Sequence, residues 1–570
     1  MTRRRRVTLV LVAAAAALSL VGCVAIPTDG PIQEGDVVPA EPGAAFPQAS
    51  DPLPGASPVD IVNGFLTAGA AGLYDDFAVA RKYLTGSASA GWDPRAGVIL
   101  YPLQERQPRV EERDDGSILV SIPLVATVDA AGVYIEAEPA AAPRELVFEL
   151  TRDTADQWRV SQLDDGVVMA ASSFTNQYRR TAVYFASPDR TQLVPDPRWF
   201  PTAKIATSAV GALLEGPSAW LRDAVVTGSP EGARLRTPAV SVSVERVASF
   251  DITSPAGLGV AADRNLLQAQ LEAMLLRLPG TVIDEVVVTA DGLPWEPTAA
   301  TWVLDRDVAP AGGPYVLQAE QLAVLDGGEI VPIEGVAALA GLDARDPAIS
   351  LDEQIRVVLD GTRRLMYLPP DGAAPVELLT GSQLMAPSID RYGWIWTGEQ
   401  VSGGGLTAVR ADAQLVEVAA QWLEGRTVRS LRVARDGARV AIVSAGPSEG
   451  DVTVDVAAVV RDEDGTPRLL GETPLVIGAA LVDAIQVSWV DEVTVAVLGR
   501  SGAQNVQMVH LVTLGGPTTA LPLNDGATAI AAGRGDRSLY LVDLEGTLFS
   551  LQSGSWVREA LGVRSPVFPG

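Results

Sequence analysis

The chain has 570 residues, 47% of them hydrophobic, which is enough for three or four packed domains. Its formal net charge is −27, and so acidic a surface repels phosphate backbones, which argues against nucleic-acid binding. A single cysteine excludes a disulfide within the chain, and a single histidine leaves no zinc site of the usual cysteine and histidine type. The 54 glycines and 40 prolines follow no period and favour β-rich domains with many turns.

Residues 1–22 have the pattern of a secretory signal peptide. Four arginines, Arg3 to Arg6, precede an apolar run from Val7 to about Leu20. The run is too short to cross a hydrocarbon core of roughly 30 Å as a helix. It leads into Leu-Val-Gly-Cys at residues 20–23, which resembles a bacterial lipobox, where the cysteine is joined to diacylglycerol and its new amino terminus is acylated. We therefore expect cleavage after residue 22 and lipidation of Cys23.

Acylation at Cys23 predicts a protein held on the outer face of the cell membrane. Two or more acyl chains anchor a protein stably in a membrane, because each buried CH₂ contributes about 0.8 kcal/mol of binding free energy. Loss of the four leader arginines changes the net charge from −27 to −31, so basic patches are not expected to hold lipid headgroups. The alternative is an ordinary secreted protein with a spare thiol, which would be a liability in an oxidising compartment.

Residues 23–56 are predicted to form a tether. Eight prolines and few large apolar residues lie between positions 24 and 58. Such a segment cannot bury enough surface to offset the entropy lost on ordering.

Residues 57–180, the first region, are predicted to form an α+β domain. Ser57-Pro58-Val59-Asp60 is typical of a helix start, and Ile61, Val62, Phe65 and Leu66 follow as its apolar stripe. We expect a second helix over 76–84 that ends at Gly86. Strands are expected at 98–101, 118–125, 133–136, 146–150 and 157–163, in one curved antiparallel sheet covered by the helices.

Residues 181–297, the second region, alternate between strand and helix patterns. A strand at 182–185 precedes a helix over 204–214, which ends at Gly216-Pro217. Strands at 240–244 and 247–252 precede a long helix over 264–278, and a further strand follows at 286–288. In the long helix, Leu267, Leu271, Met274, Leu275 and Leu278 share one apolar face. The pattern predicts an α/β or α+β sandwich.

Residues 303–570, the third region, contain short apolar runs, Asp-Gly turns and no convincing long helix. A similar short apolar segment recurs at intervals of 40 to 54 residues, at positions marked by Ile349, Ile389, Leu431, Ile485 and Ala529. A repeat of this length made only of short strands is typical of a β-propeller. A pair of β-sandwiches is the alternative.

The chain offers no convincing catalytic, cofactor or metal site. His510 has apolar neighbours and is interpreted as a structural histidine whose hydrogen bonds are satisfied. Residues 446–450 match G-x-S-x-G, but strands flank them, whereas a nucleophile elbow needs a helix and a partner histidine. Residues 462–465 lack the remaining calcium ligands and are expected to form a solvated turn. There is no P-loop and no G-x-G-x-x-G after a strand.

The order of these parts resembles the LpqB family of actinobacterial lipoproteins over nearly the whole chain. The residues that carry the resemblance are Cys23-Val24-Ala25-Ile26-Pro27 with Gly30-Pro31, Ile61-Val62-Asn63-Gly64-Phe65-Leu66, Ala80-Arg81-Lys82-Tyr83-Leu84-Thr85, Leu213-Leu214-Glu215-Gly216-Pro217 and Gln268-Ala269-Gln270-Leu271. The resemblance implies a multidomain α+β and all-β protein. Its parts would be an NTF2-like α+β domain at 57–180, a GerMN-like α/β domain at 181–297 and a β-propeller at 303–570.

The resemblance also implies a function. It predicts a non-enzymatic accessory protein that contacts the extracytoplasmic domain of the MtrB sensor kinase. Through phosphorylation of the response regulator MtrA, that contact would influence cell-envelope homeostasis and division. The resemblance supplies no catalytic residues and no cofactor.

A second hypothesis is a propeller that binds cell-wall glycans or acts on them. An acidic surface that carries tryptophans can stack on sugars. The candidate residues are Trp394, Trp396, Trp422, Trp489 and Trp556. The simpler interpretation, which we favour, is that these rings pack between blades.

Overall fold

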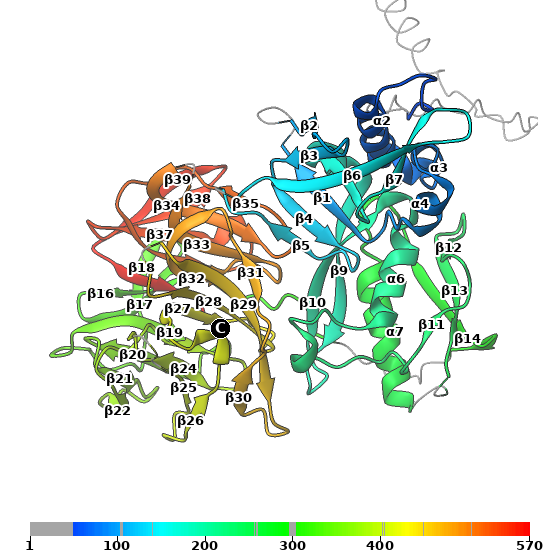
Figure 1. Ribbon diagram of the computed structural model, residues 1–570. Coiled ribbons are helices and arrows are strands. Elements are labelled where there is room, and N and C mark those ends of the chain that lie inside the picture. The colour runs from blue at the N-terminus through cyan, green and yellow to red at the C-terminus, as the bar shows by residue number, and fades with distance from the viewer. Residues whose placement is uncertain are drawn as a thin grey trace, which may run out of the picture. The chain divides into compact units, whose positions relative to one another are not determined.

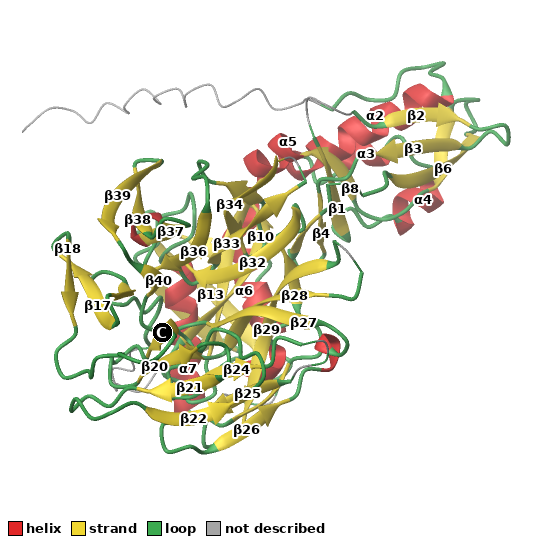
Figure 2. Ribbon diagram, turned by 90° about the vertical axis from the view of Figure 1, so that its left-hand side faces the viewer, coloured by secondary structure: helices red, strands yellow, loops and turns green. Residues whose placement is uncertain are grey.

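The computed structural model describes residues 49–102, 107–139, 141–255, 257, 260–295, 304–401, 403, 405–448, 450–502 and 504–570. The chain divides into two units, Met1–Pro47 and Gln48–Gly570. The predicted signal peptide, Cys23 and most of the predicted tether therefore lie outside the described residues. Strands predominate in the second unit, as the yellow arrows of Figure 2 show.

The first helix of the second unit, α2 (Pro58–Ala71), begins where the sequence predicts it. The Asp60 amide donates to the Ser57 hydroxyl at 3.2 Å, and the Ser57 amide donates to the Asp60 carboxylate at 3.3 Å. This reciprocal pair satisfies amide groups that a helix start leaves unpaired. Ile61, Val62 and Phe65 are buried, as the apolar stripe predicts.

The helix predicted over 76–84 is wrong in length. Only α3 (Ala78–Arg81) is helical, because Asp76 and Phe77 have left-handed φ angles of 53° and 63°. The unusual backbone places the Phe77 ring in the core, edge-on to Trp92 at 5.8 Å. Gly86 does not end a helix either; it begins α4 (Gly86–Gly91), which Thr85 caps.

The strands of the first region form two sheets, so the single antiparallel sheet predicted here is wrong. The strands are β1 (Gly97–Tyr101), β2 (Arg109–Glu112), β3 (Ile118–Ile122), β4 (Ala126–Asp129), β5 (Tyr134–Glu136), β6 (Arg144–Arg152), β7 (Trp158–Gln162) and β8 (Val167–Ala170). The sheets have the orders β5-β4-β1-β8 and β2-β3-β6-β7, and β8 pairs parallel to β1. Pro123 has no amide to donate, and the strand predicted at 118–125 ends before it, as β3.

The second region contains the predicted βαβ alternation and one unpredicted hairpin. Its elements are β9 (Tyr178–Ala186), β10 (Leu193–Pro201), α6 (Ile205–Glu215), β11 (Arg234–Leu235), β12 (Ser241–Val242), β13 (Val247–Thr253), α7 (Ala261–Leu275), β14 (Glu285–Ala290) and β15 (Leu293–Pro294). Strand β14 pairs parallel to β13, with α7 as the connection. The stripe from Leu267 to Leu278 is buried, as predicted. The helix α5 (Ala171–Gln177) precedes β9.

Six sheets make up the described part of the third region, each with four antiparallel strands and one with an added strand, β31. Figure 1 shows them in order from green to red. The strands are β16 (Tyr315–Gln318), β17 (Gln321–Asp326), β18 (Glu329–Pro332), β19 (Ala344–Ile349), β20 (Arg356–Asp360), β21 (Arg364–Tyr367), β22 (Val376–Thr380), β23 (Ser388–Ile389), β24 (Ile395–Gly398), β25 (Leu406–Val409), β26 (Leu415–Val418), β27 (Thr427–Val433), β28 (Arg439–Ala445), β29 (Val452–Arg461), β30 (Pro467–Leu470), β31 (Leu475–Ile477), β32 (Leu481–Trp489), β33 (Thr494–Ser501), β34 (Gln504–Thr513), β35 (Thr518–Ala520), β36 (Ala527–Ala532), β37 (Leu539–Asp543), β38 (Thr547–Gln552), β39 (Ser555–Leu561) and β40 (Arg564–Val567).

The sheets of the third region follow one another in a ring. The five sequence marks lie in β19, β23, β27, β32 and β36, the first strand of five successive sheets. Each of these strands contacts the next, and β40 contacts both β36 and β19. Strand β40 pairs with β16, so the end of the third region completes the sheet that its beginning starts.

Candidate functional site: the junction of the second and third regions

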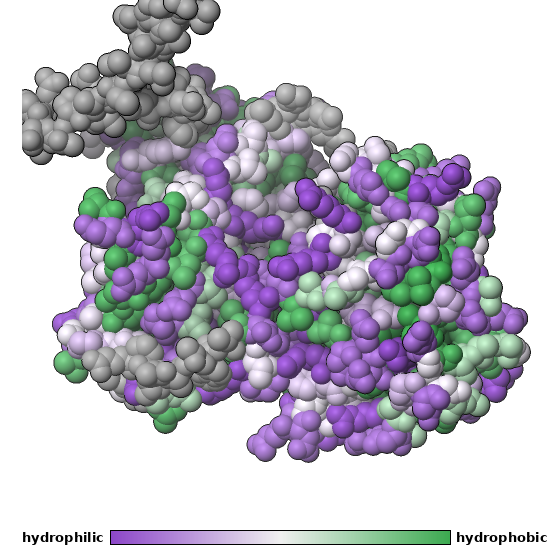
Figure 3. Space-filling view, turned by 180° about the vertical axis from the view of Figure 1, so that it is seen from behind, coloured by the Kyte–Doolittle hydropathy of each residue, from purple (hydrophilic) through white to green (hydrophobic). Residues whose placement is uncertain are grey.

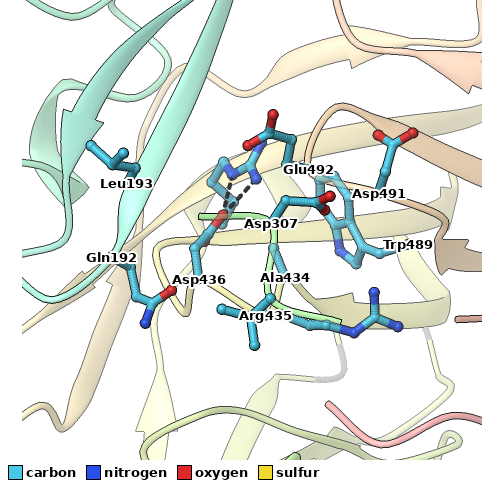
Figure 4. Close-up of a pocket in the computed structure, with 11 residues that line it drawn as sticks. Gln192, Leu193, Asp307, Ala434, Arg435, Asp436, Trp489, Asp491 and Glu492 are labelled. Atoms are coloured by element: carbon cyan, nitrogen blue, oxygen red, sulfur yellow. Dashed lines mark hydrogen bonds and ion pairs between the residues drawn. The ribbon is translucent and has the colours of Figure 1, made fainter. Parts of the chain in front are cut away.

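A shared hydrophobic core joins the second and third regions. It contains Leu221 and Ala224 from the second region together with Val454 and Val456 of β29. Beside this core, segment 304–308 at the start of the third region contacts the second region, where Leu193 N donates to Asp305 O at 2.8 Å. We call this contact the junction. Figure 4 shows it, with Gln192 and Leu193 on one side and the loops after β27 and β32 on the other.

Glu492 is the centre of the junction. Its carboxylate accepts hydrogen bonds from Arg306 Nη2 at 2.5 Å and Nε at 3.1 Å, and from the Tyr184 hydroxyl at 2.8 Å. The Arg306 guanidinium also lies over the Tyr184 ring, 4.7 Å from its centre. Burial, and then the negative charge of Glu492, raises the pKa of Tyr184. The hydroxyl therefore remains a hydrogen-bond donor at neutral pH.

Other charged side chains near Glu492 also have partners. Asp307 forms an ion pair with Arg534 at 3.2 Å, and burial together with the nearby carboxylate of Glu492 raises the pKa of Asp307. Burial lowers the pKa of Arg435 to about 10, and its guanidinium donates to the carbonyls of Ala532 and Gly533, each at 2.9 Å. These groups bind backbone carbonyls and opposite charges within the third region.

One polar atom of the junction lacks a partner. Arg439 is buried, is paired with Asp436 at 2.5 Å and lies over Trp489 at 5.0 Å. Within the described residues its Nη1 atom has no hydrogen-bond partner. The adjacent cavity of about 20 Å³ has room for about one water molecule. The cavity is too small for a substrate.

Two further contacts hold the regions together. Arg391 donates to Asp189 and to the Thr191 hydroxyl, both at 2.7 Å, beside an open cavity of about 320 Å³. Glu136 of β5 accepts hydrogen bonds from the Thr518 amide and hydroxyl at 2.9 and 2.6 Å, which joins the first region to the third. The polar side chains here fasten one region to another.

His510 is buried, as predicted, but its hydrogen bonds are not satisfied. The side chain lies in β34, and neither ring nitrogen has a partner within the described residues. Burial lowers the pKa of His510, because the apolar surroundings disfavour the charged imidazolium. The residue cannot reach a substrate from this position.

The other sequence candidates also lie where chemistry is disfavoured. Residues 446–450, of which Glu449 lies outside the described residues, connect β28 to β29, so they form a loop between strands as predicted. Asp462 is in the turn between β29 and β30, where its carboxylate accepts from the Thr466 amide at 2.9 Å and pairs with Arg468 at 2.6 Å. The residues that the structure describes contain no cluster of metal-binding side chains.

The tryptophans of the glycan hypothesis are largely unavailable for stacking on a sugar. Trp394 and Trp396 are 1% and 0% exposed, and Trp489 is 4% exposed. Trp422 and Trp556 pack partly buried against hydrophobic clusters. The interpretation that these rings pack within the fold is confirmed for the three buried residues.

Sequence reasoning did not find the junction. Arg306 and Glu492 lie 186 positions apart, and nothing in the sequence around either residue indicates the other. The only local signal is the alternation of acidic and basic residues at 305–307, which is also typical of a solvated loop.

Family models match three parts of the chain. "Lipoprotein LpqB, N-terminal domain" matches residues 51–175, "Sporulation and spore germination" (Germane) matches 182–296, and "Lipoprotein LpqB beta-propeller domain" matches 320–569. The chain belongs to the LpqB lipoprotein family. The Germane match covers the βαβ elements of the second region, and the propeller match covers the ring of sheets from β17 to β40.

Curated LpqB relatives align over nearly their full length. "Lipoprotein LpqB" of Thermobifida fusca is 28% identical, with 99% of each chain covered. That of Streptomyces avermitilis is 27% identical over 100% of this chain and 99% of the relative, and that of Bifidobacterium longum is 26% identical over 97% and 98%. A solved structure of dihydro-heme d1 dehydrogenase NirN aligns with 54% of this chain and 66% of that one, at a TM-score of 0.27 and 13% identity, too low to support an inference.

The LpqB relatives are lipoproteins, which agrees with a lipid-anchored protein. No helix within the described residues is long and apolar enough to cross a membrane. Cys23, the predicted lipidation site, lies outside the described residues, so its modification stays a prediction.

Proposed function

We propose that the protein is a non-enzymatic accessory lipoprotein that binds the outer domain of an MtrB-type sensor kinase and modulates MtrAB signalling. The observation that carries this proposal is the junction, where Glu492 binds Tyr184 of the second region and Arg306, while Asp307 and Arg435 are engaged within the third region. An enzyme needs convergent acid, base or nucleophilic groups at a cavity that a substrate can enter. The open cavity of about 320 Å³ beside the junction is lined by Asp390, Arg391 and Arg435, which are engaged by Arg461, Asp189 and a backbone carbonyl, and this supports a scaffold that presents a surface to another protein.

The parts of the chain suit such a scaffold. We interpret the ring of sheets as a six-bladed propeller and the first region as an NTF2-like domain. Lipidation of Cys23 would place the scaffold on the extracytoplasmic face, and the tether would let it reach a kinase in the same membrane. Confinement to one membrane raises the effective concentration of both partners, so a modest intrinsic affinity is sufficient.

Binding is tested with the compact unit Gln48–Gly570 and the purified outer domain of the kinase. We expect saturable binding by calorimetry. Because the surface is net acidic, the association rate, followed in a kinetic binding assay, should depend on the salt concentration. Absence of binding at high micromolar concentration, together with normal MtrA phosphorylation after deletion of the gene, would refute the proposal.

The anchor is tested by complementation of that deletion. Cys23→Ser removes the only thiol in the chain and should release the protein to the medium or leave it as precursor, without restoring signalling. Thr28→Ala, five positions further on, is the matched control and should behave as wild type. The anchor assignment is wrong if Cys23→Ser protein is processed and remains bound to the membrane as well as wild type.

A further inference from the structure

A cavity of about 300 Å³ lies between the first and second regions, away from the junction. One wall is formed by β1 and by the turn that joins β4 to β5. The opposite wall is formed by the end of β10 and by one face of α6. The volume is at the lower end of the range for sites that bind small molecules.

Contacts within the protein hold the walls of this cavity in place. The Trp199 amide donates to Gly132 O at 2.8 Å, and the Trp199 indole donates to Gly515 O at 2.7 Å. Phe174 stacks on Tyr178 at 4.6 Å and packs against Trp199 at 4.7 Å. Because these contacts already fix the aromatic side chains, binding would cost little ordering entropy.

Gly211 indicates that the space is kept open. It lies in the middle of α6 and lines the cavity, and a Cβ placed on it would meet no atom within 4 Å. A glycine inside a helix is destabilising relative to alanine. Because no protein atom lies close to Gly211, the space beside α6 is open to a ligand.

The polar groups of the cavity are of mixed character. Within the described residues, no hydrogen bond or ion pair joins the side chains of Tyr178, Lys204, Ser208 and Glu215 to the rest of the protein. These four side chains supply hydrogen-bond donors and acceptors, one positive charge and one negative charge. The Val98 and Phe200 side chains supply apolar surface. A strongly anionic or cationic ligand would meet a like charge at this rim.

We propose that this cavity binds an uncharged sugar unit. A sugar ring has apolar C–H faces that pack on aromatic and aliphatic side chains, and hydroxyl groups that both donate and accept hydrogen bonds. The free side chains around Gly211 match that chemistry. None of the five tryptophans of the glycan hypothesis lines this cavity.

The test uses the compact unit Gln48–Gly570 with N,N′-diacetylchitobiose and maltose as uncharged probes and phenyl phosphate as an anionic ring. Binding is followed by saturation-transfer NMR and by calorimetry. We expect at least one of the two sugars to bind and phenyl phosphate not to bind. Binding of phenyl phosphate, with or without a sugar, or of none of the three, would overturn the proposal.

Three variants test whether the sugar binds in this cavity. Gly211→Leu fills the space and should weaken sugar binding more than tenfold, with an unchanged or raised melting temperature because leucine favours the helix. Gly86→Leu is the matched control: its Cβ also meets no atom within 4 Å, but it lies in α4, outside the cavity. Tyr178→Phe removes one hydroxyl and should weaken binding about three- to tenfold. Sugar binding unaffected by Gly211→Leu would refute the assignment.

Discussion

Replacing Glu492 with glutamine should loosen the junction more than any single exposed ion pair could. The Glu492 and Arg306 side chains are 13% and 26% exposed, so both charges are largely removed from water. Breaking a buried pair by removing one charge costs about 3–5 kcal/mol, because the other charge is left uncompensated. The partial exposure of Arg306 lets water recover part of that loss, and the amide oxygen of glutamine can still accept from Tyr184. We therefore expect a loss of about 2–3 kcal/mol.

The loss can be measured by thermal unfolding of the compact unit and by the rate of proteolysis in the segment after residue 304. Asp284→Asn is the matched control, because the Asp284–Arg246 pair is 52% and 57% exposed and should contribute less than about 1 kcal/mol. Adding Arg306→Met to Glu492→Gln should recover part of the stability, since no unpaired charge then remains. Glu492→Gln behaving like Asp284→Asn would show that the junction does not depend on this pair.

Three further results are expected. The free energy of unfolding should fall as the pH drops below 6.5, the ordinary pKa of histidine, because the unfolded chain then binds a proton that buried His510 does not. His510→Leu should reduce this pH dependence by at most about 1.4 kcal/mol per pH unit, as measured by denaturation at pH 5.5 and 7.5. Gly132→Ala should destabilise more than Gly116→Ala, since both have positive φ but only the first would place a Cβ 2.6 Å from Trp199 O; equal melting temperatures would contradict this. Trp199→Phe should cost about 1 kcal/mol by removing its bond to Gly515 O, and an unchanged denaturation midpoint would show that this bond contributes nothing.

Local chemistry made much of the fold predictable. The Ser57 cap and the stripe from Leu267 to Leu278 depend on residues a few positions apart, so sequence patterns suffice to find them. The marks at Ile349 and Leu431 also depend on a pattern, because each sheet of the ring needs a similar buried first strand.

The features that the sequence did not predict have physical causes of two kinds. Strand β10 contains Pro195, Pro197 and Pro201, which argue against a strand, yet it pairs with β9 along its whole length because the partner strand lies on one side only. The left-handed Phe77 is stabilised by burial of its ring, a tertiary effect that local propensity does not contain. The candidate sites depend on contacts between distant residues, such as Arg306 with Glu492, for which one sequence has no signal.

The pairing of β40 with β16 has a consequence for the order of folding. The two strands lie at opposite ends of the third region, so the sheet that contains them requires closure of the longest loop in that region. Such non-local pairing slows folding, and until it forms, β16 offers an unpaired edge to other chains. A chain that emerges from its amino terminus would therefore expose that edge until residues 564–567 had followed. A protein that covers β16 during that interval would lower the risk of pairing with other chains.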